Sequence, residues 1–246
     1  MPNLRLNEIR WRVAVILTVV AALVWAYLFI YSVVQRHKAE RFLADMKSFP
    51  FDSAGINEVG SFVERHGGLP IHPALGHLAP TCNIRDCDFE VSMKNWLIPV
   101  PEEGTIAHSI CRALMHVGIR PWVVASYFTV RGGKLQETST TITQLKFGER
   151  RGSTVLMEIA YDVITCEKTQ SDCPLHDQPE NYMVAKPFAS GFDADLLDAW
   201  VSQGAGVPMS RVFDVDLRCM TSLLHPCRDF AELAPSAWAD HAQRQQ

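Results

Sequence analysis

Three side chains able to bind an anionic group recur at helical spacing in the middle of the 246-residue chain. His108, Arg112 and His116 lie four residues apart, so a helix would place them on one face. Imidazole and guanidinium groups donate hydrogen bonds to anions, which makes this face a candidate binding site. A solvated helix face is the alternative interpretation. Cys111 lies on the same segment, but its apolar neighbours favour a buried structural thiol over a nucleophile.

A second candidate binding position lies at the end of an alternating segment, where Asn95 and Trp96 follow one another. Together with Trp122, at the start of a later segment, they are candidates for the rim of a pocket. Core packing of the amphipathic rings is the alternative.

Histidine and aspartate residues cluster in two further regions without forming a recognisable metal site. The spacings of His66, His72 and His77 match no compact ligand set, so the sequence predicts no metal and no cofactor. Asp193 is expected to cap a helix, and Asp214 with Asp216 to lie on the outer face of a strand. The alternative function is a membrane-tethered hydrolase, in which several of these side chains would converge on one cleft: His66, His72, His77, His108, Asp193 and Asp214.

The motifs of common enzyme classes are missing from the sequence. It contains no GxSxG, HExxH, SxxK, CxxC, GxxxxGK[ST] or GxGxxG pattern. Their absence favours a binding or interaction protein over an enzyme.

The stretch 13–34 is apolar throughout and carries no charge. Twenty-two helical residues exceed the roughly 20 needed to cross a hydrocarbon core of about 30 Å, so we predict an uncleaved membrane-spanning helix. No small-residue cleavage site follows it, which argues against a secretory signal. Lys/Arg residues are nearly balanced on its two sides and do not decide the orientation.

Six of the seven cysteines form three close pairs, which predict three local disulfides. The pairs are Cys82 with Cys87, Cys166 with Cys173, and Cys219 with Cys227. Their spacings are longer than those typical of zinc sites, and Cys111 is expected to be a free thiol. Disulfides indicate an oxidising compartment, so we expect a cytoplasmic N-terminus and an extracytoplasmic C-terminal domain.

Small residues recur every four positions along the predicted span, at Ala14, Thr18, Ala22 and Ala26. Such a stripe allows close helix approach and makes a homodimer possible, although alanine is common in spans.

Hydrophobic periodicity predicts one α+β domain with an antiparallel sheet flanked by helices. The expected organisation is a cytoplasmic tail at 1–12, the span at 13–34, a helical neck at 35–50, the domain at 51–240 and a frayed tail at 241–246. Helices are expected from Asp52 or Ser53 to Arg65, and at 105–117, 193–201 and 227–241. Strands are expected at 88–96, 121–130, 134–147, 153–166, 181–187 and 211–217, with a loop at 69–80. Arg131-Gly132-Gly133 predicts a hairpin turn between the second and third of these strands.

The net charge of the predicted domain argues against nucleic acid as a partner. Leaving out Arg5, Arg10, Arg12 and Glu8, residues 35–246 carry a net charge of −6. An acidic domain lacks the basic surface that nucleic acids require, and it would not lie flat on an anionic leaflet. The sequence thus predicts a single-pass envelope protein whose domain binds another protein or an envelope component.

Overall fold

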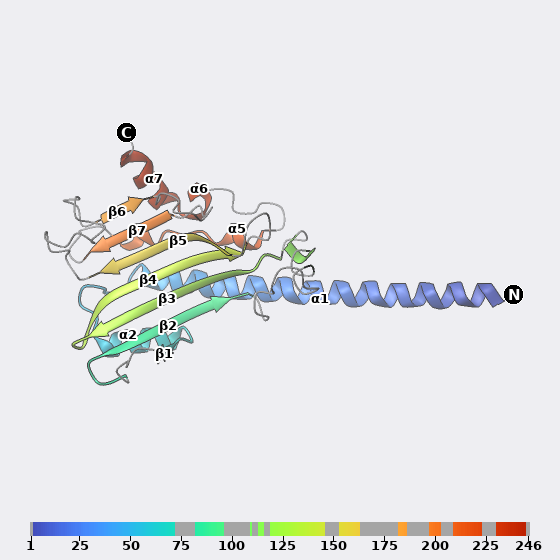
Figure 1. Cartoon of the computed structure of the whole chain (residues 1–246), viewed down its shortest axis with the longest axis horizontal. Helices are drawn as coiled ribbons and strands as arrows, with labels where there is room; N and C mark the ends of the chain where they lie inside the picture. The colour runs from blue at the N-terminus through green and yellow to red at the C-terminus, as the bar shows by residue number, and fades with distance from the viewer. Residues whose placement is uncertain are drawn as a thin grey trace.

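A single 45-residue helix, α1 (Pro2–Met46), runs from the N-terminus into the body of the protein (Figure 1). The computed structural model describes residues 2–71, 82–95, 109, 113–115, 119–145, 153–162, 182–185, 197–202, 209–222 and 230–244. After Pro2 the helix contains neither proline nor glycine, so no residue in it interrupts the backbone hydrogen bonds. The predicted span and neck are therefore one continuous helix, which ends before Pro50.

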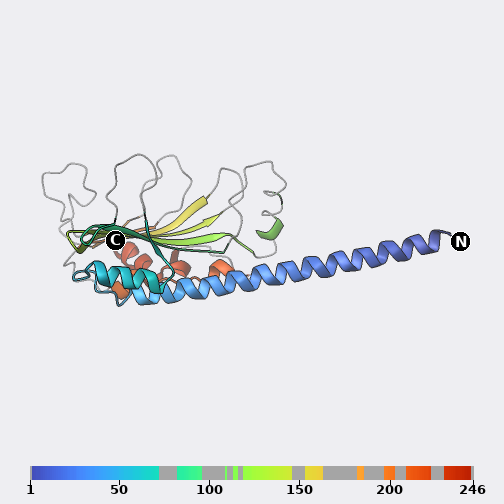
Figure 2. The same cartoon turned by 90° about the horizontal axis from the view of Figure 1, so that it is seen from below.

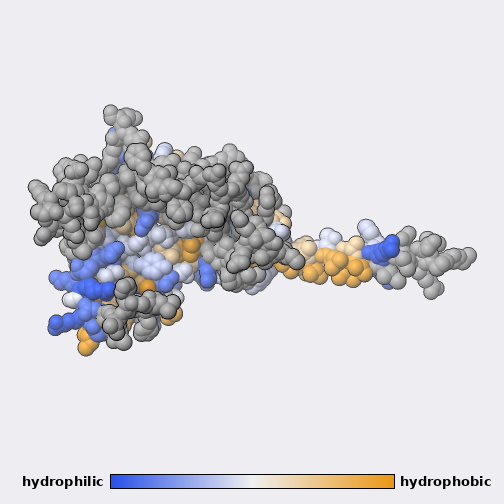
Figure 3. Space-filling view, in the orientation of Figure 1, coloured by the Kyte–Doolittle hydropathy of each residue, from blue (hydrophilic) through white to orange (hydrophobic). Residues whose placement is uncertain are grey.

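The N-terminal half of α1 lies outside the domain. Most of its large apolar side chains between Trp11 and Ile30 are 41% to 71% exposed, whereas Trp25, Leu28 and Phe29 are half-buried, and Figure 3 shows an orange surface along the helix. Among the described residues, α1 provides the one segment long and apolar enough to cross a membrane.

The C-terminal half of α1 belongs to the core of the domain. Ala39, Phe42, Leu43 and Met46 are all at most 2% exposed, at spacings of three and four residues that place them on one face. The same helix is thus solvent-accessible and apolar at one end and a packed core element at the other.

Seven strands form one sheet in the order β1-β2-β3-β4-β5-β7-β6. They are β1 (Leu69–Ile71), β2 (Cys87–Lys94), β3 (Trp122–Arg131), β4 (Lys134–Leu145), β5 (Ser153–Asp162), β6 (Tyr182–Ala185) and β7 (Leu197–Ser202). Strands β1 to β5 are antiparallel, which confirms the antiparallel prediction for this part of the sheet. β7 instead runs parallel to β5 and antiparallel to β6, so the sheet is mixed.

The β3–β4 hairpin is the centre of the sheet and was predicted from its turn. Gly132 and Gly133 have φ values of 61° and 80°, as a two-residue type I′ turn requires. Tertiary structure places Val124 opposite Ile142 and Phe128 opposite Thr138 across this hairpin.

The helix α2 (Ile56–Arg65) begins later than predicted. Asp52 and Ser53 lie in the preceding turn, and Gly55 is the N-cap, whose N–H donates to Oε2 of Glu58 at 3.1 Å. Asp52 instead accepts a 2.8 Å hydrogen bond from the hydroxyl of Tyr161 in β5. The predicted cap is thus used to fix the connection between α1 and α2 to the sheet.

The predicted loop at 69–80 begins with a short strand, so that prediction is wrong for β1. Pro70 lies within β1 because β1 is the edge strand, where one missing N–H donor costs no hydrogen bond within the sheet. Residues 72–81 lie outside the described residues.

In the C-terminal third, the sequence predicts a helix where the structure has a strand, and a strand where the structure has a helix. The expected helix at 193–201 is, where described, strand β7, whose Leu197, Ala199 and Val201 alternate into the core. The expected strand at 211–217 is a short helix, α4 (Met209–Val212), followed by a turn.

Helical structure near the C-terminus follows the prediction more closely. α5 (Arg218–Thr221), α6 (Phe230–Leu233) and α7 (Pro235–Arg244) follow α4. Pro235 breaks the helix as expected, since its fixed φ suits the first position of α7. α7 extends to Arg244, into the tail at 241–246 that the sequence predicts to fray.

All these helices cover one face of the sheet, as Figure 2 shows, and an aromatic cluster joins the two layers. Phe62 of α2 packs against Phe42 of α1 with ring centroids 5.7 Å apart, and against Phe128 of β3 at 5.8 Å. Phe49, from the connection between α1 and α2, packs on Phe62 at 4.7 Å and on Phe51 at 5.1 Å. Through this aromatic cluster, α1, α2 and the sheet pack into one core.

One predicted disulfide lies wholly among the described residues. Cys82 and Cys87 are bonded, with Cα atoms 4.4 Å apart, and close the turn that leads into β2. Cys219 is also disulfide-bonded, while its predicted partner Cys227 and the pair Cys166 and Cys173 lie outside the described residues.

Candidate functional site

Asn95, a predicted pocket residue, fastens α1 to the sheet. It is 6% exposed, and its Nδ2 donates to Oγ of Ser32 at 2.8 Å and to the carbonyl oxygen of Arg120 at 2.7 Å. Its Oδ1 accepts the N–H of Trp122 at 2.8 Å. Every strong hydrogen-bonding group of this amide is occupied by the protein itself. We call this set of four residues, Ser32, Asn95, Arg120 and Trp122, the helix clamp.

Two arginines reinforce the helix clamp from either side. Nη1 of Arg36, one turn beyond Ser32, donates to Oγ1 of Thr221 at 2.7 Å. Nη1 of Arg120 donates to the carbonyl oxygen of Ser222 at 2.6 Å, and burial lowers the pKa of this guanidinium. α1 is thus bonded to both the sheet and α5.

The remaining predicted binding residues lie outside the described residues: Trp96, His108, Arg112 and His116. Ser109 and residues 113–115 are helical, in agreement with the helix expected there. The anion-binding face therefore stays a prediction. Trp122 is fully buried, as core packing requires.

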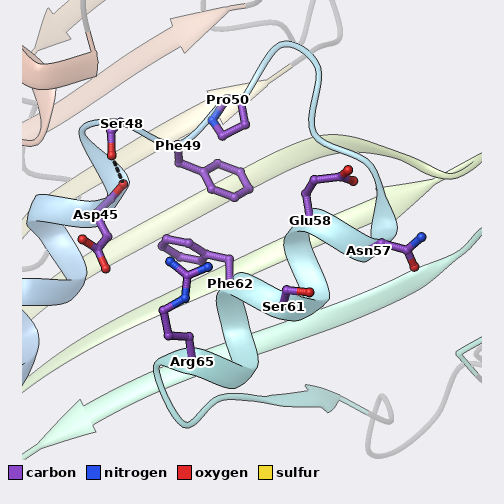
Figure 4. Close-up of a pocket in the computed structure, with 9 residues that line it drawn as sticks. All are labelled: Asp45, Ser48, Phe49, Pro50, Asn57, Glu58, Ser61, Phe62 and Arg65. Carbon is purple, nitrogen blue, oxygen red and sulfur yellow. Dashed lines mark hydrogen bonds between the residues drawn. The ribbon is translucent and has the colours of Figure 1, made fainter.

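A groove that the sequence analysis missed lies between α2 and the segment 45–50, which is the end of α1 with the connection that follows it (Figure 4). It has a volume of about 440 Å³ and a floor formed by the rings of Phe49 and Phe62. Polar and charged side chains make up most of the rim: Asp45, Ser48, Asn57, Glu58, Ser61 and Arg65, with Pro50 closing one end. Two of these side chains are already bonded to the backbone. The Ser48 hydroxyl donates to the carbonyl oxygen of Asp45, and the Glu58 carboxylate accepts the N–H of Gly55.

Three rim side chains remain available to a ligand. Asn57, Ser61 and Arg65 are exposed and form no hydrogen bond with another described residue. Their spacing of four residues on α2 places them along one edge of the groove. An aromatic floor with amide, hydroxyl, guanidinium and carboxylate groups around it suits a segment with both apolar and charged side chains. The four-residue spacing was the only sequence signal, and the opposite wall depends on how the segment 45–50 packs.

His66 lies beside the groove as a buried packing residue. Its ring packs edge-on against Phe42 at 5.2 Å, and its Nε2 is 3.1 Å from Oδ2 of Asp45. Burial lowers the pKa of His66, and the Asp45 carboxylate only partly opposes this effect. The imidazole is therefore neutral at neutral pH.

The described residues do not assemble the cleft required by the hydrolase alternative. Asp214 accepts hydrogen bonds from Lys47 at 3.3 Å and from Ser236 at 2.7 Å, whereas His66 contacts Asp45. The other four residues of that hypothesis lie outside the described part of the chain.

The face of the sheet opposite the helices is polar, and Asp88 of β2 pairs there with Arg131 of β3, whose Nη1 lies 2.8 Å from Oδ1 of the carboxylate. Glu90 of β2 accepts from the hydroxyl of Tyr127 at 3.5 Å, and Glu158 of β5 accepts from Ser139 at 2.9 Å. Three strand spacings separate the two glutamates, or about 14 Å. Paired carboxylates in glycoside hydrolysis lie about 5 to 10 Å apart. No group of three potential metal ligands occurs in the described ranges either.

The chain thus defines a class by architecture: an α+β domain built around the C-terminal half of a long helix whose N-terminal half is exposed and apolar. No family model matches it, and neither a curated protein nor a solved structure shows significant similarity.

Proposed function

We propose that the protein is a single-span membrane-anchored binding module. Its N-terminal half of α1 crosses the bilayer, and its α+β domain lies on the extracytoplasmic side and binds a protein partner or an envelope component. The observation that carries the proposal is the exposed apolar surface of α1 from Trp11 to Ile30.

This surface supports anchoring because water would solvate it unfavourably. Leu17 and Leu23 are 64% and 65% exposed, and the flanking apolar side chains are of similar exposure. Fully burying each large aliphatic side chain contributes roughly 1.5 to 3 kcal/mol. A bilayer provides that burial over the whole circumference of the helix.

The groove between α2 and the segment 45–50 is the proposed binding surface. Its buried aromatic floor and exposed Asn57, Ser61 and Arg65 fit a polypeptide segment that presents one apolar side chain next to an acidic one. The Arg65 guanidinium would pair with that acid.

Anchoring is tested by charge insertion. Leu17→Arg together with Val20→Arg should release the full chain from membranes at alkaline pH, because each arginine at the centre of a span costs about 3 kcal/mol. Lys38→Arg is the matched control and should leave the chain in the membrane fraction. Retention of the double variant would contradict anchoring.

Binding is tested by photo-crosslinking in intact cells from a probe placed at Asn57. A discrete adduct that disappears with Arg65→Glu and persists with Arg85→Glu would support the groove. An adduct unaffected by Arg65→Glu would place the binding surface elsewhere, and reproducible substrate turnover by the purified chain would replace the binding module with an enzyme.

A further inference from the structure

The end of β2 and the start of β3 lie at the end of the domain from which α1 emerges (Figure 1), and basic residues occur in or beside these segments and in the adjoining part of α1. Lys94 directly precedes Asn95 of the helix clamp, and Arg120 is itself a member. Arg36 and Lys38 follow Ser32 within two helical turns. Two acidic groups that the structure describes in this region are already engaged, since Glu40 pairs with Arg36 at 3.2 Å and Asp216 binds Arg218 at 2.9 Å.

This basic end contrasts with the charge of the whole domain, which is −6 over residues 35–246. We call the three residues Lys38, Lys94 and Arg120 the basic end, because Arg36 is paired with Glu40.

The length of α1 fixes how deep the basic end lies. Ser32 is 3% exposed and held by Asn95, so the hydrocarbon region must end before it. From Arg12 to Ser32 the helix rises about 30 Å, which equals the thickness of a hydrocarbon core. No helix length is left for a spacer. The helix clamp therefore lies at the hydrocarbon boundary, so Lys94 and Arg120 lie at the headgroup layer of about 5 to 7 Å. Lys38 lies about 9 Å beyond Ser32 along the helix, so its long side chain must extend back towards the N-terminus to reach that layer.

We propose that the basic end binds the headgroup phosphates of anionic phospholipids. This inference rests on the proposed membrane anchoring and adds a partner to it. Lys38 and Lys94 are exposed, and Arg120 is half-buried beside them. Each basic residue close to a membrane surface increases the preference for anionic lipid about five-fold. The domain stands end-on, with its body directed away from the leaflet.

The test uses the full chain in nanodiscs of phosphatidylcholine alone, or of an equal mixture with phosphatidylglycerol. The photo-reactive residue p-benzoylphenylalanine replaces Val20 in the span, Lys94 at the basic end, or Lys134 at the opposite end of the sheet. Mass spectrometry identifies the lipid adducts. We expect adducts at positions 20 and 94 and none at 134, with phosphatidylglycerol over-represented at position 94 about five-fold.

Charge reversal distinguishes simple contact with lipid from a preference for anionic headgroups. Lys38→Glu should abolish the over-representation at position 94, whereas Arg85→Glu, near the distal hairpin, should leave it unchanged. Adducts at 20 but none at 94 would overturn this inference and leave anchoring intact, whereas no adduct at 20 would overturn anchoring itself. Adducts at 94 in the proportions of the mixture would also overturn the binding of anionic headgroups.

Discussion

Asn95 shows how one buried amide can decide whether a helix and a sheet stay together. Its three hydrogen bonds join α1 to the start of β3, and no described neighbour replaces them. A buried amide with all its partners stabilises the fold, whereas an orphaned partner costs about 1 to 3 kcal/mol.

Asn95→Leu should lower the free energy of unfolding by about 3 kcal/mol, because it leaves the Ser32 hydroxyl and the Trp122 N–H buried without partners. Ser92→Ala, an exposed change on the same strand, should stay within about 0.5 kcal/mol. Chemical unfolding in detergent micelles measures both. Equal stabilities of the two variants would show that the helix clamp is dispensable.

His66 should make stability depend on pH in a defined window. Its folded pKa lies below its unfolded value of about 6.5 because the ring is buried. Between these two values the unfolded chain binds a proton that the folded chain does not. Stability should therefore be full above pH 6.5, fall as the pH drops towards the folded pKa, and level off below it.

Replacing the imidazole isolates its part of this dependence. His66→Gln should flatten the slope of unfolding midpoint against pH between neutrality and the folded pKa, while His37→Gln, at an exposed position, should not. Losses that begin only below pH 4 have another origin, since the Gly132 N–H and the Arg218 guanidinium lower the pKa values of Asp86 and Asp216. An unchanged slope in His66→Gln would contradict the assignment.

At the scale of elements, replacing two glycines by alanine should have opposite effects on stability, because a neighbouring backbone closely approaches only one of them. A Cβ on Gly68 would lie 2.4 Å from the carbonyl oxygen of Glu90, whereas one on Gly60 would meet Phe89 at 3.8 Å. Gly68→Ala should destabilise by about 1 to 3 kcal/mol through overpacking. Gly60→Ala, inside α2, should stabilise by about 0.5 to 1 kcal/mol. Thermal unfolding distinguishes them, and a neutral Gly68→Ala would mean that β1 can move away from β2.

The C-terminal half of α1 should be required for folding. A chain beginning at residue 28 keeps Ser32 and the buried face of α1, and should unfold cooperatively. A chain beginning at residue 47 loses Phe42, Leu43 and Met46, and should lack a cooperative transition by circular dichroism. If the shorter chain unfolds as the longer one does, α1 is not a core element.

Sequence patterns predicted those elements whose information is local. Alternation located β2, and the Gly132-Gly133 turn located β3 and β4. Short apolar runs fit a helix and a strand equally well, so the sequence wrongly predicts a helix where β7 lies. The conformation of β7 depends on its pairing with β5, in which Met157 lies opposite Leu197, 40 positions later in the sequence. The groove lies within residues 45–65, but its shape depends on how the connection after α1 folds back on α2, which no periodicity in the sequence indicates.

At the scale of the whole molecule, cysteine oxidation tests sidedness. The Cys82–Cys87 bond closes the turn before β2, and two further pairs are predicted. Unfolded without reductant, the chain should take up one maleimide, at Cys111, and after reduction seven. Mass spectrometry counts the additions. Seven additions before reduction would favour a reducing compartment and an inverted orientation.

In the proposed membrane-anchored state, the unbroken backbone of α1 would act as a rigid lever. From Ser32 to Met46 the helix extends about 21 Å, and the packing around Phe42 leaves no hinge. Spans tilt more in thinner bilayers to match hydrophobic thickness. A change of about 20° in tilt, within the normal range, would swing Met46 sideways by roughly 7 Å. Bilayer thickness would thus set where the distal groove points.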